Sequence, residues 1–426
     1  MKISIIVPTH NRASQLEVAL NSFLDCRQEC DLEIVVVDNN SSDTTRDVCT
    51  QYSNVVYVFE PRTAFSRARK TGAENASGDI FVFVDDDIIL DKGSLREIIR
   101  VFDSHPNCGL IAGRINPYFI EQPPEWAISA NKKFNGWSLF NPEYQPYLSD
   151  GLCSVNSACG PLMAVRRSVY FSVDGFPPDI IGVESNKGER QFFKLYIGPG
   201  DYGLSQKVTS KHLKILYSPS ISCSHVIQPF RSTRAFWRSR LIGEGQHIAI
   251  TAREFYSVSP FRCFLLRCKY LAMLRHSYVQ VLRVLSKHQE CCPEETLSKI
   301  EIDYNLARGF LSMDRILQKH PKLSRYLWNI ATKGVTDDLF DEVLHYLPEE
   351  YLHITSRQYI YSDAPLTTHL MKNQYTSDIC LIHPTTTLKM ASFIYRQLYI
   401  LFLLPKLCVK YLQKTIKMLN SNPLMN

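Results

Sequence analysis

The segment Phe81-Val82-Phe83-Val84-Asp85-Asp86-Asp87 joins four apolar residues of high strand propensity to three consecutive carboxylates. The apolar run is typical of a strand buried on both faces in a parallel sheet. The carboxylates would then lie at the carboxyl end of that strand, the edge where open α/β sheets bind ligands. Because adjacent carboxylates repel one another, we expect positive charge beside them, and a divalent cation carrying a diphosphate is the leading candidate. A solvated turn rich in aspartate is the alternative.

The composition of the whole chain is that of a globular protein. Of its 426 residues, 45% are hydrophobic and 21% are charged, which allows a large core and two or three domains. The formal net charge of +6 is too small to indicate nucleic-acid binding by itself. We therefore expect no nucleic-acid partner.

The thirteen cysteines and the apolar segments indicate in which cellular compartment the protein is expected. The cysteines show no paired zinc-ligand spacing, which favours free thiols in a reducing compartment. Residues 1–7 predict a first strand rather than a signal peptide. No apolar run approaches the roughly 18 residues that a membrane-spanning helix needs.

Strand and helix patterns alternate through the first hundred residues. Strands are expected at 3–7, 33–37, 55–59 and 81–84, and helices at 13–24, 64–76 and 92–102. Asp91 is placed to cap the last of these helices. The alternation predicts parallel strands with right-handed crossovers, so the polar loops that follow Val7, Val37 and Val84 should share one edge. No G-x-G-x-x-G follows the first strand, which argues against a dinucleotide-dependent dehydrogenase.

Four motifs in this region occur in a specific order. They are Val7-Pro8-Thr9-His10-Asn11-Arg12, Val37-Asp38-Asn39-Asn40-Ser41, Ala68-Arg69-Lys70-Thr71-Gly72 and Val84-Asp85-Asp86-Asp87. Together they resemble the nucleotide-binding half of a family-two glycosyltransferase with the GT-A fold. Each motif alone is weak, but four in order on alternating strands are specific. Lys70 departs from the asparagine that many members of the family have.

The resemblance implies roles for these residues. Donor-binding residues would be Pro8, Thr9, Arg12, Asp38, Arg69, Asp85 and Asp86. Asp38 would contact the base edge, where a carboxylate suits an N–H of uracil or guanine. Asp87 would bind Mn²⁺ or Mg²⁺. Structural alternatives stay open: a strand end at Pro8, a solvated helix start at Arg12, a helix cap at Asp38 and a surface salt bridge at Arg69.

Beyond residue 104 the pattern becomes rich in proline and aromatic residues. Trp126, Trp137, Tyr118, Tyr144 and Tyr147 suit either a mobile cover with aromatic faces for sugar rings or an irregular loop with buried aromatics.

A second chemical landmark is Ile197-Gly198-Pro199-Gly200-Asp201, which leads into a predicted helix. A carboxylate at a helix N-terminus is kept ionised by the helix dipole. The resemblance implies that Asp201 is the catalytic base, although Gly200 and Gly203 replace residues that are often acidic in the family. Asp201 as a simple N-cap is the alternative, and Glu184 and Glu189 would then be the next candidates for the base.

A short strand at 216–225 ends in His225, which the resemblance makes a metal or phosphate ligand; a structural histidine is the alternative. Four arginines follow closely and could form a cationic lid over the diphosphate: Arg231, Arg234, Arg238 and Arg240.

The positive excess is concentrated after Arg231, where helices are expected, including one at 261–286. Lys406, Lys410, Lys414 and Lys417 share one face of a predicted amphipathic helix. That pattern favours a helix lying on an anionic membrane surface, and packing against the protein itself is the alternative.

These patterns predict an α/β, GT-A-like, mostly parallel sheet flanked by helices, followed by a mainly helical C-terminal region. The domains would be a catalytic domain at 1–240 and a basic helical region at 241–426. The predicted function is an inverting glycosyltransferase that moves a sugar from a nucleoside diphosphate, UDP favoured, to a hydroxyl of a glycan or lipid-linked acceptor. It would be cytoplasmic, at the inner face of the cell membrane. A sugar nucleotidyltransferase and a degenerate membrane-bound scaffold are the alternatives.

Overall fold

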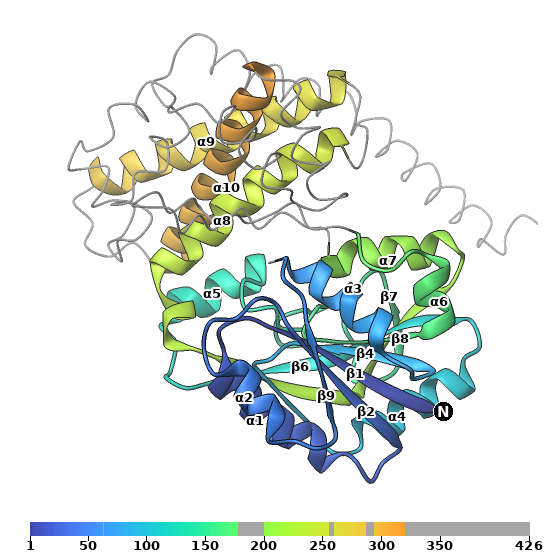
Figure 1. Cartoon of the computed structure of the whole chain (residues 1–426). Helices are drawn as coiled ribbons and strands as arrows, with labels where there is room; N and C mark the ends of the chain where they lie inside the picture. The colour runs from blue at the N-terminus through green and yellow to red at the C-terminus, as the bar shows by residue number, and fades with distance from the viewer. Residues whose placement is uncertain (63, 178–199, 255–259, 287–293, 320–426) are drawn as a thin grey trace, which may run out of the picture.

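The computed structural model describes residues 1–62, 64–177, 200–254, 260–286 and 294–319 (Figure 1). The strands are β1 (Lys2–Thr9), β2 (Asp31–Asp38), β3 (Val55–Phe59), β4 (Ile80–Val84), β5 (Ile88–Leu90), β6 (Cys108–Phe119), β7 (Cys153–Val155), β8 (Leu162–Arg166) and β9 (Lys214–Ile227). The helices are α1 (Ala13–Asp25), α2 (Thr45–Thr50), α3 (Phe65–Asn75), α4 (Ser94–Ser104), α5 (Glu125–Phe134), α6 (Arg167–Ser172), α7 (Gly200–Ser210), a 3₁₀ turn η1 (Pro229–Ser232), α8 (Arg234–Glu254), α9 (Pro260–Ser286) and α10 (Glu294–Lys319).

Within the described residues, nine strands form one sheet in the order β3-β2-β1-β4-β8-β6-β9-β5, with β7 paired to β9. The first four strands along this order are parallel, and β6 also runs parallel to β9. All five residues of β4 are buried, as a central strand covered on both faces requires. The predicted α/β fold, a sheet flanked by helices and followed by further helices, is confirmed.

The register of the first strands brings their carboxyl ends together. Thr9, the last residue of β1, pairs with Asp38, the last residue of β2. Phe83 of β4 pairs with Ile6 of β1, so Asp85 follows at the same edge. The predicted convergence of the loops after β1, β2 and β4 is therefore confirmed.

Close packing of α3 against the sheet depends on Gly72. A Cβ atom there would lie 2.4 Å from Ile6 Cγ2 and 2.9 Å from Val37 Cγ2. No larger side chain fits without a shift of the helix or of two buried core residues. Gly72 thus lets α3 sit directly on β1 and β2, and this placement carries Arg69 to the sheet edge.

Several local expectations need correction. β5 and β7 were not predicted, and β9 is a strand of 14 residues rather than a short one. Asp91 does not cap α4 with its side chain, which accepts a hydrogen bond from the Ser222 hydroxyl instead. Glu29 takes the capping role, because its carboxylate accepts the backbone N–H groups of Gly93, Leu95 and Arg96.

The aromatic stretch divides between core and surface. Trp126, Trp137 and Tyr144 are buried, so for these three the expectation of exposed faces for sugar rings is wrong. Tyr118 and Tyr147 are exposed. Trp137 belongs to an edge-to-face cluster in which it contacts Phe119 and Trp237.

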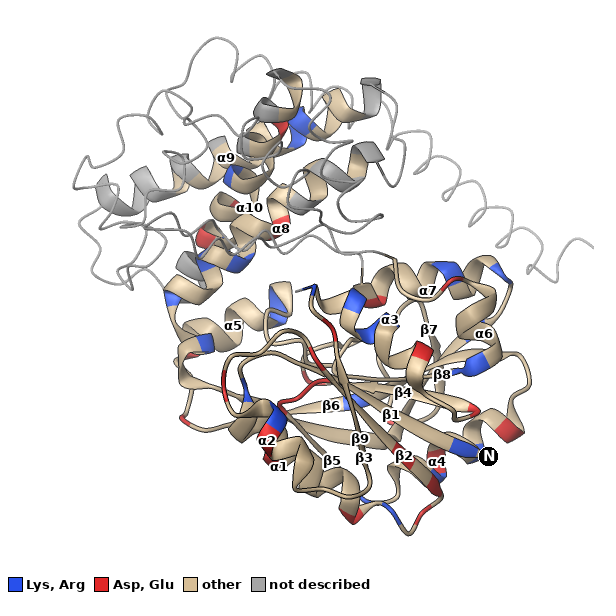
Figure 2. Ribbon diagram, in the orientation of Figure 1, with Lys and Arg blue, Asp and Glu red and all other residues tan. Residues whose placement is uncertain are grey.

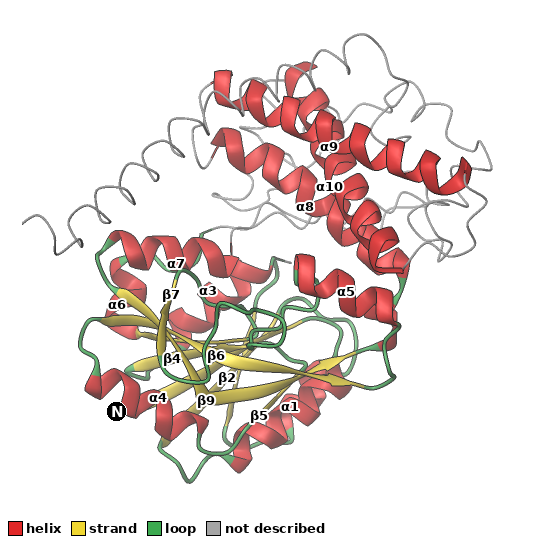
Figure 3. Cartoon of the chain, turned by 180° about the vertical axis from the view of Figure 1, so that it is seen from behind, coloured by secondary structure: helices red, strands yellow, loops and turns green. Residues whose placement is uncertain are grey.

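The helices α8, α9 and α10 lie beyond the sheet, and α10 packs on α5 (Figure 3). Acidic and basic residues both occur along α8 and α10 (Figure 2). None of the helices in the described part of the chain has an apolar run long enough to cross a membrane. The predicted domain boundary at residue 240 falls within α8, and the four lysines of the predicted surface helix lie outside the described residues.

Candidate active site

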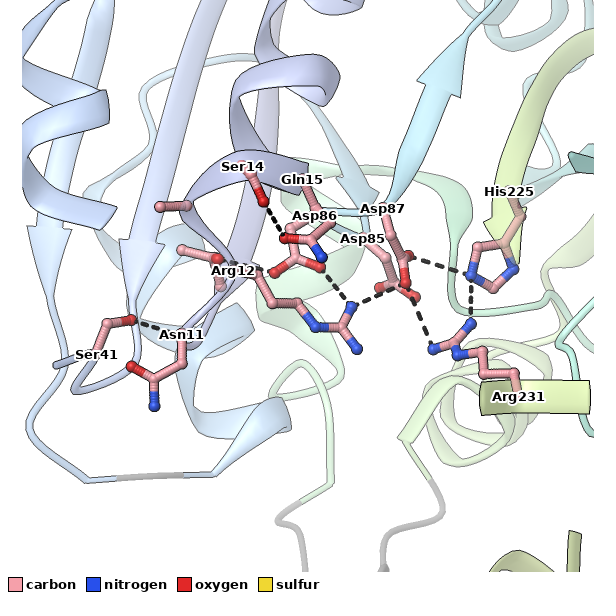
Figure 4. A network of polar contacts seen from close by, with 12 residues as sticks. Asn11, Arg12, Ser14, Gln15, Ser41, Asp85, Asp86, Asp87, His225 and Arg231 are labelled. Carbon is pink, nitrogen blue, oxygen red and sulfur yellow. Dashed lines mark hydrogen bonds and ion pairs between the residues drawn. The ribbon is translucent and has the colours of Figure 1, made fainter. Parts of the chain in front are cut away.

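The loop after β1 is attached directly to the carboxylates that follow β4 (Figure 4). The Thr9 hydroxyl donates to Asp86 Oδ2 at 2.8 Å. Arg12 NH1 donates to Asp86 Oδ1 at 2.9 Å and to Asp87 Oδ2 at 2.8 Å. The positive charge expected beside the aspartates is therefore supplied in part by Arg12.

On its other side Asp87 meets β9 and η1. His225 Nε2 lies 3.1 Å from Asp87 Oδ1, and Arg231 NH2 lies 3.4 Å from Asp87 Oδ2. Arg231 NH1 is 2.8 Å from the same His225 Nε2. Asp87 is thus the point where β4, the start of α1, β9 and η1 converge (Figure 4).

Asp86 and Asp87 are neighbours whose pKa values shift in opposite directions. Burial raises the pKa of Asp86 to about 6, against the opposing effect of Arg12. Burial would also raise the pKa of Asp87, but His225, Arg231 and Arg12 outweigh it and lower that pKa below its usual range. Asp87 is therefore ionised at neutral pH, as a metal ligand must be.

The atoms around Asp87 fit a hard divalent cation. Asp87 Oδ1 and His225 Nε2 lie 3.1 Å apart. That spacing allows both atoms to contact one cation at about 2.1 Å. Within the described residues no three His, Cys, Asp or Glu side chains gather as a metal cage, so a cation would need additional ligands from phosphate and water.

Asp85 connects this centre to Asp201. The side chain of Asp85 is 21% exposed, against 4% for Asp87. Its Oδ1 accepts a hydrogen bond from Arg69 NH2 at 2.9 Å, and the same nitrogen donates to Gly160 O at 2.9 Å. The backbone N–H of Gly160 donates to Asp201 Oδ2 at 2.7 Å. One arginine and one glycine therefore link the carboxylate after β4 to the carboxylate that begins α7.

Arg69 is 1% exposed, so the alternative of a surface salt bridge is wrong. Its guanidinium lies over the rings of Phe65 and Phe176, at 4.1 and 5.1 Å from their centroids. The two aromatic rings and Asp85 fix the guanidinium of Arg69 in place.

Asp201 is the second residue of α7, as the sequence predicted. Burial raises the pKa of Asp201, although Arg69 and the Gly160 N–H favour the ionised form. A carboxylate with a raised pKa is a better proton acceptor than an ordinary aspartate. The environment of Asp201 is therefore unlike that of Asp87, although both are aspartates of one site.

Asp38 ends β2 in a buried position. Its Oδ1 accepts the backbone N–H of Ser41 at 2.8 Å, and its Oδ2 accepts the Tyr57 hydroxyl at 2.7 Å. Ser41 precedes α2, whose N-cap is Thr44, so the contact lies in the loop and is not the helix cap of the alternative. Tyr57 is a partner that sequence patterns did not indicate. Each oxygen keeps a second lone pair, so these bonds leave acceptor capacity for a base N–H.

The predicted site residues fall into two groups. One group lies at the sheet edge in two sets of polar contacts that the backbone of residues 85–87 joins: Thr9, Arg12, Asp86, Asp87, His225 and Arg231 in the first, and Arg69, Asp85 and Asp201 in the second. Pro8 and Asp38 lie beside it, at the ends of β1 and β2. Sequence reasoning missed Gly160, whose only signal is its position before β8.

The predicted arginine lid needs correction. Arg234 NH1 is 2.7 Å from Glu301 Oε2, and Arg238 NH2 is 3.9 Å from Glu301 Oε1. Both arginines are buried, so they face α10 and not the aspartates. Arg231 alone of these three reaches Asp87.

Comparisons with known proteins agree with the geometry. Residues 4–171 match the family model described as Glycosyl transferase family 2. An uncharacterized glycosyltransferase of Nostoc sp. is 33% identical over 116 residues, which are 26% of this chain and 36% of that protein. An O-antigen chain rhamnosyltransferase of Salmonella anatum is 26% identical over 185 residues, or 42% of this chain and 57% of that protein. The chain thus spans about a third of the first relative and just over half of the second.

Two solved structures resemble the fold more distantly. A mannosyltransferase from Pyrobaculum calidifontis, in complex with GDP-Man and Mn²⁺, has a TM-score of 0.40 and 16% identity, covering 84% of this chain and 87% of its own. GalNAc-T7 with UDP, GalNAc and Mn²⁺ has a TM-score of 0.40 and 14% identity, covering 59% and 51%.

The order of the four motifs, the convergence of their loops at one sheet edge and the family match all concern the same part of the chain. Residues 4–171 match the model of glycosyltransferase family 2.

Proposed function

We propose that the protein is an inverting, metal-dependent glycosyltransferase that moves a sugar from a nucleoside diphosphate to a hydroxyl of a glycan or lipid-linked acceptor. The supporting observation is the link from Asp85 through Arg69 and Gly160 to Asp201. In this proposal the link joins the carboxylate that accepts the proton to the carboxylate cluster that would bind the cation. Direct displacement at an anomeric carbon needs those two groups on either side of the reacting atom.

In this proposal Asp201 is the catalytic base. Its carboxylate takes the proton of the acceptor hydroxyl as that oxygen bonds to the anomeric carbon. The bond from the anomeric carbon to the diphosphate oxygen breaks, and the electron pair leaves with the diphosphate. Attack from the face opposite the leaving group inverts the configuration of the carbon.

Asp87 and His225 would hold the Mn²⁺ or Mg²⁺ ion, which would supply charge neutralisation of the leaving diphosphate. Arg12 and Arg231 contact Asp87 from opposite sides, and each can donate to phosphate oxygens. Asp85, the most open of the three carboxylates, and Asp86 complete the donor side together with Arg69.

The base and ribose would lie at the ends of β1 and β2. Pro8 and Thr9 are the last two residues of β1, and Asp38 offers an acceptor for a base N–H. That acceptor suits the N–H groups of uracil, thymine and guanine, and we propose UDP as the donor nucleotide. The test is a thermal-shift screen of UDP, GDP and dTDP with Mn²⁺, Mg²⁺ or EDTA. Binding at 100 times Kd stabilises by about 2.7 kcal/mol, which such a screen detects. Equal melting temperatures in all conditions would refute the proposal.

We further propose that residues 1–240 are the catalytic domain, that residues 241–426 are a helical basic region, and that the protein works at the cytoplasmic face of an anionic membrane. Replacement of Lys406, Lys410, Lys414 and Lys417 by Gln should release it from anionic vesicles, because each cation near anionic lipid is worth about 1 kcal/mol. High salt should have the same effect. Vesicle flotation measures this, and a wild-type protein that stays unbound at low salt excludes the membrane role.

Two other functions make different predictions. A sugar nucleotidyltransferase would need a glycine-rich basic loop after β1, whereas this loop contains Pro8 and is tied to Asp86 by Thr9. A degenerate scaffold would show no nucleotide-dependent stabilisation in the screen above.

A further inference from the structure

Arg231 is held in the site from two directions. Its side chain contacts Asp87 and His225. Its backbone carbonyl accepts the indole N–H of Trp137 at 2.9 Å, and Trp137 is fully buried. The position of the guanidinium therefore depends on where the short turn η1 lies.

The turn leads directly into α8, which starts at Arg234. Arg234 forms a 2.7 Å ion pair with Glu301 of α10 and lies over the ring of Trp126, 4.5 Å from its centroid. One turn later Arg238, which is 1% exposed, faces the same carboxylate. Glu301 is thus a buried partner of the first two turns of α8. This helix begins only three residues after Arg231.

Two glycines allow the backbones of α8 and α10 to pack directly against each other. A Cβ on Gly245 would lie 2.2 Å from the carbonyl oxygen of Leu306. A Cβ on Gly309 would lie 2.1 Å from the carbonyl oxygen of Ile242. The two backbones are therefore in direct contact, and such close packing transmits a displacement of one helix to the other. Because α10 also packs on α5, the start of α8 is fixed relative to the sheet domain.

We propose that Glu301 is a positioning residue that holds Arg231 against the diphosphate-binding centre. The C-terminal helices are then part of the donor site and do more than attach the protein to a surface. This inference rests on the proposed function, because it assumes that Arg231 contacts the diphosphate. Glu301 itself touches neither substrate nor reacting atoms.

The test compares full-length variants by calorimetric titration with UDP and Mn²⁺. Arg231→Gln should weaken binding by about tenfold to a hundredfold, the value of a charge-assisted hydrogen bond. Glu301→Gln should weaken it by about threefold to tenfold, and Glu301→Asp, which keeps the charge, should weaken it less. In the double variant Glu301→Gln, Arg231→Gln, affinity should equal that of Arg231→Gln alone, because Glu301 acts only through Arg231.

The matched control is Asp314→Asn. Asp314 is a buried acid of the same helix that pairs with Arg267 of α9 at 2.6 Å. Its loss should lower the melting temperature without changing UDP affinity. A Glu301→Gln protein that binds UDP like the wild type, or effects that multiply in the double variant, would overturn the inference.

A second readout needs no nucleotide. The indole N–H signal of Trp137 reports on its bond to the Arg231 carbonyl, and it should shift and exchange faster with water in Glu301→Gln but not in Asp314→Asn. Failure of UDP to bind the wild type would count against the proposed donor, while the Trp137 signal still decides on Glu301. If Glu301→Gln does not fold, Glu301→Asp is judged by the same two measurements, and an unchanged Trp137 signal overturns the inference.

Discussion

Asp87 and Asp201 are the same residue type in one site, yet their surroundings differ. Asp87 contacts Arg12, Arg231 and His225, which lower its pKa against the effect of burial. Asp201 is reached by a backbone N–H and lies near Arg69, and there burial prevails and raises its pKa. The first environment keeps a charge available for cations, and the second favours a carboxylate that takes up a proton. The number of positively charged side chains in direct contact with each carboxylate decides whether its pKa is lowered or raised.

The largest expected effect is that of Asp201→Asn. The amide keeps the size and can still accept the Gly160 N–H, but it cannot take a proton. Turnover, measured as release of nucleoside diphosphate in the presence of acceptor, should fall at least about a hundredfold. Affinity for UDP and Mn²⁺ should barely change. Near-normal turnover would move the base elsewhere, with Glu184 and Glu189 as the next candidates.

Asp87→Asn should act on binding and on stability. We expect it to abolish the Mn²⁺-dependent rise in melting temperature with UDP. It should also lower the free energy of unfolding by about 1–3 kcal/mol while leaving the fold intact, because Arg231 loses its ionic partner and Arg12 keeps only Asp86. Asp201→Asn should not destabilise the fold at pH 7, since a buried carboxylate with a raised pKa favours the neutral form. Unchanged Mn²⁺-dependent binding in Asp87→Asn would exclude this ligand.

The pH dependence of turnover should reflect the raised pKa of Asp201. The base must be ionised, so the rate should fall about tenfold per pH unit below that pKa, which lies above the usual value of about 3.9. The same shift means that the contribution of Asp201 to folding stability is present below its unfolded pKa and is lost as pH rises through the folded pKa. A pH–rate profile measures the position of this acid limb.

Asp86, with a pKa of about 6, is the competing source of an acid limb. If Asp201 is the base, Asp86→Asn should leave the acid limb of the pH–rate profile at the same pH, even where the rate itself is lower. If the acid limb disappears in Asp86→Asn, it reflects the titration of Asp86 and not that of Asp201.

Gly160→Ala should give the smallest effect, because it disturbs only the hydrogen-bonded link between Asp85 and Asp201. The new Cβ would lie 3.2 Å from Arg69 NH2 and 3.4 Å from Asp201 Oδ2, so one of them must move by a few tenths of an ångström. Turnover should fall severalfold, about threefold to tenfold. Gly151→Ala is the matched control, since a Cβ there meets nothing within 4 Å. Equal rates in the two variants would show that the link does not matter for turnover.

The fold of the first hundred residues could be predicted from local pattern. Buried strands have continuous apolar runs and helices have their own period, so β1 to β4 and the helices α1, α3 and α4 were located within a few residues. The register of β1 with β2 then places the ends of both strands at one edge. Asp85, Asp86, Asp87 and Asp201 were recognisable because carboxylates directly after a buried strand or at the start of a helix are chemically conspicuous.

Contacts between distant segments could not be predicted in this way. The pairing of Asp87 with His225 joins residues 138 positions apart, and no local pattern specifies it. The contacts of Glu29 with the start of α4, of Tyr57 with Asp38 and of Arg234 with Glu301 also join distant segments, and no local pattern specifies them. Sequence by itself determined which groups are present and which strand or helix carries them. Tertiary structure decided which cation neutralises which carboxylate, because charge and burial depend on neighbours that packing alone brings together.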